Sequence, residues 1–177
     1  MAVSSATAGL DMAVQSLDMM SGSEIITTPF TFVASSNAIL YNNCTPIFVD
    51  IDPETYNIDT EKIEEKITVE TKAILPVHYA GQPCDMDKII KIAEDHNLFV
   101  IEDAAHAIGT EYNGRKIGTI GDLTVFSFHA AKNIVTGEGG IVTTDNEGLY
   151  KKLLLLRSHS IDKSTLERYG ANAGYEY

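Results

Sequence analysis

The chain has 177 residues, with 13 basic and 25 acidic side chains and a formal net charge of −12. Its 44% hydrophobic content is enough for one buried core and excludes a disordered chain, and no apolar run approaches the roughly 18 residues of a membrane span. No basic residue precedes Lys62, which argues against a signal peptide and against nucleic acid as a partner. Cys44 and Cys84 lie in no CxxC or Cys/His cluster, so we expect a reduced, cytoplasmic protein.

Amphipathic stretches alternate with short apolar runs, a pattern typical of helices that cross over between mostly parallel strands. In the first part of the chain we expect a helix over 8–20 ended by a glycine turn, a strand over 24–27, a helix over 33–41, a buried strand over 46–49 and a helix over 60–67. The pattern continues with a strand over 72–76, a helix over 86–96 and a strand over 98–101. The sequence therefore predicts an α/β fold.

The pattern changes after Gly109, where short β-type runs follow one another without intervening helices. We expect strands over 110–112, 123–128 and 139–144, then a helix over 147–157, and no closing element in the polar segment 158–177. The residues Glu102 to His106 directly follow the strand predicted at 98–101. Ligands of parallel sheets gather at such carboxyl ends, so this segment is a candidate site.

Lys132 follows an apolar strand and precedes the glycine-rich segment 137–140. An ammonium group partly desolvated near strand ends has a lowered pKa, which makes it a plausible nucleophile that forms an imine. A lysine after a strand is more commonly a solvated surface residue, and position alone leaves both interpretations open.

Asp103 lies after an apolar strand in an alanine-rich turn, where a carboxylate needs a cationic partner or hydrogen-bond donors. It is either the N-cap of a following helical turn or the partner of a protonated pyridine nitrogen. His106, three residues further on, either braces that carboxylate or a cofactor ring, or is a core histidine.

Small hydroxyl residues open the first predicted helix, in the segment Ser4 to Thr7. The free N–H groups of a helix start can bind an anion, although ordinary capping explains the same residues. The Ser127 hydroxyl precedes Lys132 by five positions and can reach the same anion.

Five motifs occur in order along the chain, and together they resemble the DegT/StrS family of sugar aminotransferases over nearly its whole length. They are TPFTFVA from Thr28, FVDID from Phe48, VH with GQP from Val77, IEDAAHA from Ile101, and FSFH from Phe126 with Lys132 and TGEGG. The resemblance implies a fold-type I pyridoxal phosphate enzyme. Its large domain would be a three-layer αβα structure with a mostly parallel seven-stranded sheet, in a homodimer with sites at the subunit interface.

The resemblance also implies residue roles. Lys132 would bind the cofactor covalently and act as acid and base, Asp103 would pair with the pyridine nitrogen, and His106 would lie against the cofactor. Further cofactor contacts would come from Phe32 stacking on the ring and from Ala6, Thr7 and Ser127 at the phosphate. Ala6 stands where many members have glycine. No metal site is expected.

The usual family reaction passes an amino group, commonly from glutamate, to a keto group of a nucleotide-linked deoxysugar for polysaccharide, lipopolysaccharide or antibiotic sugar synthesis. Members are longer than this chain, so residues 1–177 would be the large catalytic domain without the C-terminal small domain. One alternative is a fragment that binds cofactor or dimerises without turnover. Another is a pyridoxal-dependent sugar dehydratase, but those relatives carry histidine at the position of Lys132, so lysine favours transamination.

Overall fold

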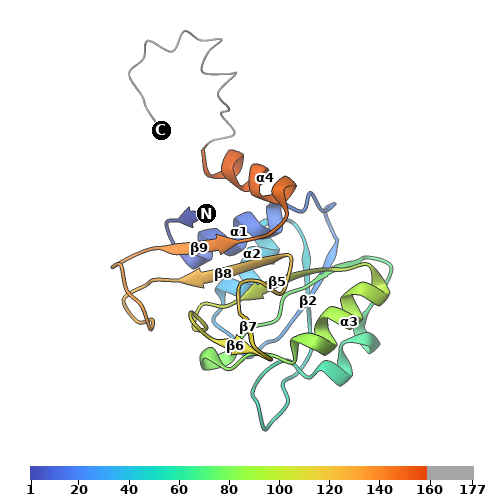
Figure 1. Ribbon diagram of the computed structural model, residues 1–177. Coiled ribbons are helices and arrows are strands. Elements are labelled where there is room, and N and C mark those ends of the chain that lie inside the picture. Colours follow the sequence, from blue (N-terminus) through green and yellow to red (C-terminus); the bar gives the residue numbers. More distant parts are fainter. Residues whose placement is uncertain (159–177) are drawn as a thin grey trace, which may run out of the picture.

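The computed structural model describes residues 1–158 (Figure 1). The predicted lack of a closing element in 158–177 concerns a segment that, apart from Ser158, lies outside the described residues. Within the described part, none of the helices combines the length and the apolar character that crossing a membrane requires.

Seven strands form one sheet in the order β1-β9-β8-β5-β4-β2-β3. The five strands from β8 to β3 pair in parallel, whereas β9 and β1 pair antiparallel at one edge. The strands are β1 (Ala2–Val3), β2 (Glu24–Thr27), β3 (Thr45–Phe48), β4 (Thr71–Ile74), β5 (Phe99–Asp103), β8 (Leu123–Ser127) and β9 (Gly140–Thr143). A separate hairpin consists of β6 (Glu111–Tyr112) and β7 (Arg115–Lys116). The predicted α/β class with a mostly parallel seven-stranded sheet is confirmed.

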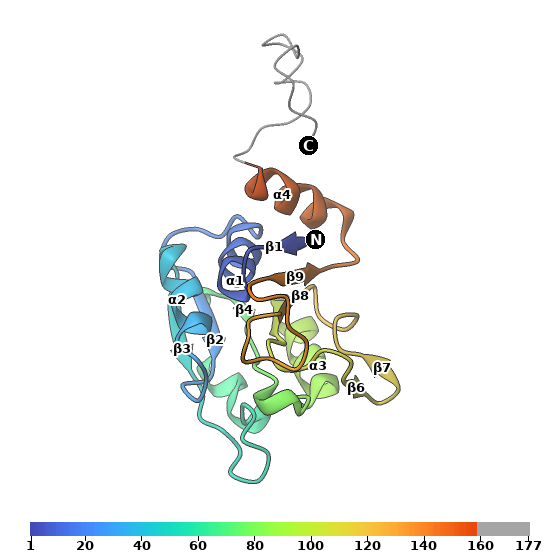
Figure 2. The same ribbon diagram turned by 90° about the vertical axis from the view of Figure 1, so that its left-hand side faces the viewer.

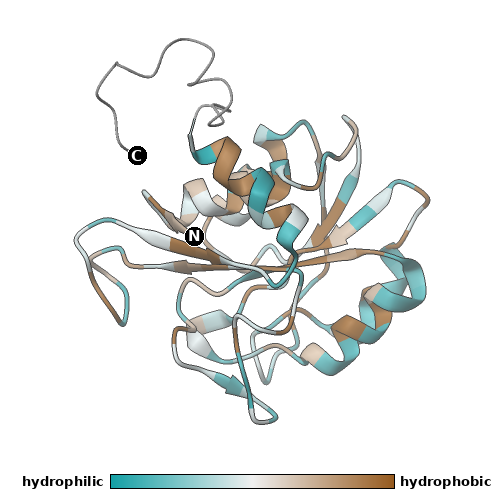
Figure 3. Cartoon of the chain, turned by 45° about the horizontal axis from the view of Figure 1, so that its top comes forward, coloured by the Kyte–Doolittle hydropathy of each residue, from teal (hydrophilic) through white to brown (hydrophobic). Residues whose placement is uncertain are grey.

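Helices cover both faces of the sheet (Figures 1 and 2). One face carries α1 (Ala6–Gln15), α2 (Ala34–Tyr41) and α4 (Glu147–Arg157), and the other carries α3 (Met86–His96). Figure 3 shows α3 with both hydrophobic and hydrophilic residues, as expected of a helix with one buried side, while the central strands are mostly hydrophobic.

The alternation of side chains along the strands divides the core into two clusters. On β5, Ile101 packs in the cluster under α1, α2 and α4, whereas Val100 packs in the cluster under α3. The same period places Asp103 on the α1/α2 side and Glu102 on the α3 side. Two neighbouring carboxylates of one strand therefore point into different layers of the molecule.

The bounds of β2, α3 and α4 match the predicted ranges, and α2 begins one residue later than predicted. The helix predicted over 8–20 begins two residues earlier, at Ala6, and stops at Gln15 and not at 20, because Asp18 adopts a left-handed φ of 49° before the glycine is reached. The helix predicted over 60–67 is two 3₁₀ turns, Thr60–Lys62 and Glu64–Lys66. An extended Ile67 ends the second turn.

The remaining corrections concern strands. The strand predicted as buried at 46–49 is the edge strand β3, whose Phe48 is 45% exposed. The strand predicted over 98–101 runs on to Asp103, so this residue is part of β5 and not of the following turn. The short strands β1 and β7 were not predicted, because two-residue strands leave no periodicity to detect.

Candidate active site

A cavity of about 730 Å³ opens at the carboxyl ends of the central parallel strands. Its volume lies within the range of about 300–1,000 Å³ that is usual for sites of small molecules. All seven predicted site residues line it: Ala6, Thr7, Phe32, Asp103, His106, Ser127 and Lys132. Segments more than 120 residues apart in sequence thus meet around one space, as expected at the strand ends of a doubly wound sheet.

Asp103 is the last residue of β5 and is only 5% exposed. Its Oδ2 accepts a hydrogen bond of 2.7 Å from the Ser35 hydroxyl, and its Oδ1 accepts one of 3.1 Å from the Ala105 N–H. The second bond caps the turn that follows β5, so Asp103 has the capping role that the sequence allowed, although no helix begins there. Within residues 1–158 the carboxylate forms no ion pair, although it lines the cavity.

Lys132 and His106 both line the cavity and are in direct contact with each other. Lys132 lies in the turn after β8, where its N–H donates to the His129 carbonyl over 2.9 Å, and its Nζ lies 2.5 Å from His106 Nε2. Desolvation, and to a smaller degree the charge of Lys132, hold the pKa of His106 below its ordinary value of 6.5. A neutral His106 can therefore accept a hydrogen bond from the Lys132 ammonium group and orient it.

The start of α1 forms another part of the wall. Ser5 is the N-cap, and its Oγ accepts the Ala8 N–H over 3.2 Å, so the predicted capping role is confirmed. Ala6 and Thr7, the first two helical residues, line the cavity together with Ser127 at the end of β8. A helix N-terminus and a hydroxyl group at one wall provide the N–H groups and positive potential that an anion requires.

Aromatic side chains form part of the cavity wall. Phe32, predicted as a stacking residue, is 75% exposed. Phe30 and Tyr79 also line the cavity, with ring centroids 4.8 Å apart, and Tyr56 packs on both of these rings at 5.9 Å. An apolar wall of this kind can hold a planar ring by stacking.

Sequence reasoning missed Ser35 and Tyr79. Ser35 lies in the first turn of α2 and is fully buried, and the available signal was a small hydroxyl residue at the start of a predicted helix. Tyr79 had no such signal, because its position depends on the loop after β4, where Ala80 adopts a left-handed φ of 50°.

A model of the DegT/DnrJ/EryC1/StrS aminotransferase family matches residues 1–177. An uncharacterized protein of Methanocaldococcus jannaschii is 56% identical over 175 residues, which are 99% of this chain and 45% of that protein. GDP-perosamine synthase of Caulobacter vibrioides is 47% identical over 161 residues, which are 91% of this chain and 43% of that enzyme.

Solved structures are similar as well. Helicobacter pylori PseC, an aminotransferase involved in the biosynthesis of pseudoaminic acid, matches with a TM-score of 0.89 at 39% identity. The match covers 92% of this chain and 44% of that one. The chain spans less than half the length of the curated relatives that it matches.

Proposed function

The chain belongs to the DegT/DnrJ/EryC1/StrS aminotransferase family, and from this premise we propose that residues 1–177 form the large catalytic domain of a pyridoxal phosphate-dependent nucleotide-sugar aminotransferase. The observation that carries the proposal is the cavity in which Lys132 Nζ lies against His106 while the buried Asp103 carboxylate lines the same space. A reactive amine and an anion that line one cavity match the two polar groups that the cofactor ring requires.

The residues present fit pyridoxal phosphate. Asp103 is buried beside neutral donors only, so a protonated pyridine nitrogen supplies the cationic partner that its carboxylate lacks among the described residues. Ala6, Thr7 and Ser127 line the cavity and would bind the phosphate, and the exposed Phe32 would stack on the ring.

When bound, the cofactor supplies an electron-withdrawing ring that stabilises negative charge on the neighbouring substrate carbon. Lys132 would hold the cofactor through Nζ, and the same Nζ would take up and return the proton that moves during transamination. Asp103 would hold a proton on the ring nitrogen. His106 accepts a hydrogen bond from Nζ and keeps the amine directed into the cavity.

The substrates and the assembly are part of the proposal. The amino donor is an amino acid, expected to be glutamate, and the acceptor is a keto group of a nucleotide-linked deoxysugar used in polysaccharide, lipopolysaccharide or antibiotic sugar synthesis. Support comes from the similarity to GDP-perosamine synthase and PseC.

We further propose a cytoplasmic homodimer. Apolar side chains are exposed on α2 and on the edge strand β3, among them Leu40, Tyr41 and Phe48. They support a subunit interface at this surface.

The test uses the full protein that carries this sequence. Incubated with pyridoxal phosphate, it should show a visible absorption band, which glutamate should convert to the ultraviolet band of the amine form of the cofactor. Borohydride reduction and mass spectrometry should label the peptide that contains Lys132, with the other lysines as internal controls. A band that glutamate leaves unchanged would support cofactor binding without transamination, and the absence of any band would refute the proposal.

A further inference from the structure

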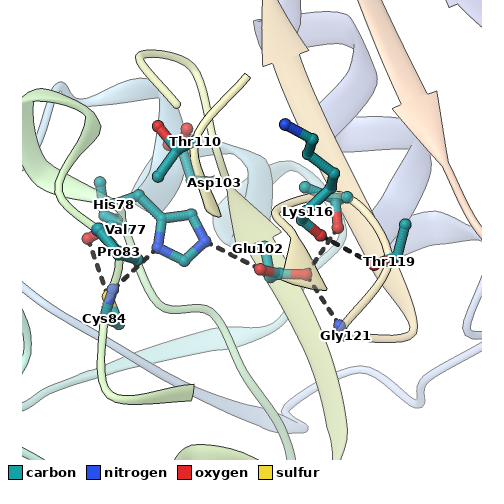
Figure 4. A network of polar contacts seen from close by, with 12 residues as sticks. Val77, His78, Pro83, Cys84, Glu102, Asp103, Thr110, Lys116, Thr119 and Gly121 are labelled. Carbon is teal, nitrogen blue, oxygen red and sulfur yellow. Dashed lines mark hydrogen bonds and ion pairs between the residues drawn. The ribbon is translucent and has the colours of Figure 1, made fainter. Parts of the chain in front are cut away.

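Glu102 lies back to back with Asp103 on β5, and its side chain is fully buried. Its Oε2 receives a hydrogen bond of 2.9 Å from His78 Nε2, and its Oε1 receives bonds of 2.8 Å from the Gly121 N–H and 2.7 Å from the Thr124 hydroxyl (Figure 4). Burial alone raises the pKa of the Glu102 carboxyl, but the hydrogen bonds outweigh burial and hold the pKa below its usual value of 4.5. The two oxygens of Glu102 thus have three donors around them, which are the contacts of an ionised carboxylate.

The His78 ring connects Glu102 to the loop after β4. Its Nδ1 accepts the Cys84 backbone N–H over 3.1 Å, so the ring proton must be on Nε2, from which it is donated to Glu102. Only one tautomer satisfies both contacts. The His78 ring thus binds Glu102 with one nitrogen and Cys84, at the other end of the loop 78–84, with the other nitrogen (Figure 4).

The same loop contacts the backbone of the candidate site. The His78 N–H donates to the Asp103 carbonyl over 3.0 Å, and the Thr110 hydroxyl donates to the Gly81 carbonyl over 3.1 Å. Gly81, at a φ of 87°, approaches so closely that an added Cβ would lie 2.7 Å from the His106 carbonyl oxygen. Contacts therefore lead from Glu102 through His78 and the loop to Asp103 and His106.

A buried carboxylate is an expensive way to stabilise a core, because an apolar pair of similar volume is commonly as stable. An apolar pair, however, forms no hydrogen bonds and so cannot fix the orientation of its neighbours. We infer that Glu102 is a positioning residue: through His78 it fixes loop 78–84, and this loop fixes the backbone of Asp103 and His106. The inference deepens the proposed function and rests on it where these two residues are taken to hold the cofactor.

Glu102→Gln is the informative change, because it keeps the shape but replaces one acceptor by a donor. If the amide oxygen faces His78, the Gly121 N–H has no acceptor. If the NH₂ group faces His78, the ring must change tautomer and its Nδ1 proton then opposes the Cys84 N–H. Thr124→Val is the matched control, because it also removes a buried hydrogen bond from Glu102 but leaves both contacts of His78 intact.

Two readouts are measured for the full protein. The first is the NMR titration of the His106 ring in the cofactor-free protein, and the second is the pH midpoint of the visible absorption change after loading with pyridoxal phosphate. Both variants should lower the melting temperature. Only Glu102→Gln should move the His106 midpoint, by about half a pH unit or more, because the distances to Lys132 and Asp103 change. The absorption midpoint should move with it.

Gly81→Ala tests the second connection with the buried network intact, and it serves if Glu102→Gln does not fold. It too should move the His106 midpoint. The inference is overturned if Glu102→Gln leaves both midpoints at the values of Thr124→Val, or if Gly81→Ala leaves the His106 titration unchanged. If the unaltered protein shows no absorption band, the proposed function fails, whereas the cofactor-free titration still decides whether Glu102 positions His106.

Discussion

Gly140→Ala should damage both the sheet and the proposed phosphate site. Gly140 begins β9 and pairs with Ser127 on one side and Val3 on the other. A Cβ at this position would lie 2.7 Å from the Phe126 carbonyl oxygen and 2.9 Å from the Ala6 nitrogen. Both atoms belong to backbone, so no side-chain rotation relieves the clash.

The expected loss follows from these distances. Ordinary contacts need about 0.5 Å or more of additional separation, and overpacking of this kind typically costs about 1–3 kcal/mol. We expect about 2 kcal/mol, since backbone on two sides must shift. Because one side is the start of α1, the N–H groups of Ala6 and Thr7 move relative to Ser127, and pyridoxal phosphate should bind about tenfold more weakly, which corresponds to about 1.4 kcal/mol.

Urea unfolding followed by circular dichroism measures the stability, and fluorescence quenching measures the cofactor affinity. Gly137→Ala is the control in the same glycine-rich segment: it has a φ of 86° and no atom within 4 Å of an added Cβ. Backbone strain alone should cost the control about 1 kcal/mol and leave the affinity unchanged. If Gly140→Ala is within about 0.5 kcal/mol of the unaltered protein, or is more stable than Gly137→Ala, the steric reasoning is refuted.

Four further outcomes are expected. Lys132→Ala should abolish borohydride labelling because alanine has no amine to condense with the aldehyde, and a labelled peptide elsewhere, seen by mass spectrometry, would remove Lys132 from its role. Asp103→Asn should keep the cofactor bound but slow the glutamate half-reaction by about 10²-fold or more in stopped-flow absorbance, whereas a residue that only caps a turn would leave the rate unchanged. The lowered pKa of Glu102 makes its contribution to stability fully present above the unfolded value of 4.5 and lost as pH falls through the lower folded value. The free energy of unfolding of Glu102→Gln should therefore change less with pH in this acid range than that of the unaltered protein. An identical pH dependence would contradict an ionised Glu102. Light scattering should show a discrete dimer at modest ionic strength, with more association as salt screens the net charge of −12, and a monomer at all concentrations would contradict the dimer.

Long periodic elements and their sheet were predictable because burial imposes a period on many residues at once. The helix at 86–96 is strongly amphipathic and bounded by Asp85 and Asn97, so its observed limits match the prediction. The 60–67 segment has apolar residues at helical spacing as well, but only Ile63 is fully buried, and too little apolar area is available to hold a full helix.

The candidate site was predictable where chemistry and position coincide in sequence, as for Asp103 at a strand end. The contact of Ser35 with Asp103 and the role of Glu102 were not predictable, because both depend on which layer of the molecule each face of α2 and β5 packs against. The alternation along β5 sends Asp103 to Ser35 and Glu102 to His78, and that direction is known only when the layers are assembled.

The antiparallel edge of the sheet has a consequence for the order in which the molecule is completed. Ala2 pairs with Ile141, and the Val142 N–H donates to the Met1 carbonyl over 2.9 Å, so the start of α1 is held by a strand made more than 130 residues later. During synthesis the first helix leaves the ribosome long before that strand exists, and contacts of such large sequence separation form slowly. In a refolding experiment, pyridoxal phosphate should therefore bind later than the central strands become buried. The rate of cofactor binding would then report the rate at which the edge strands pair.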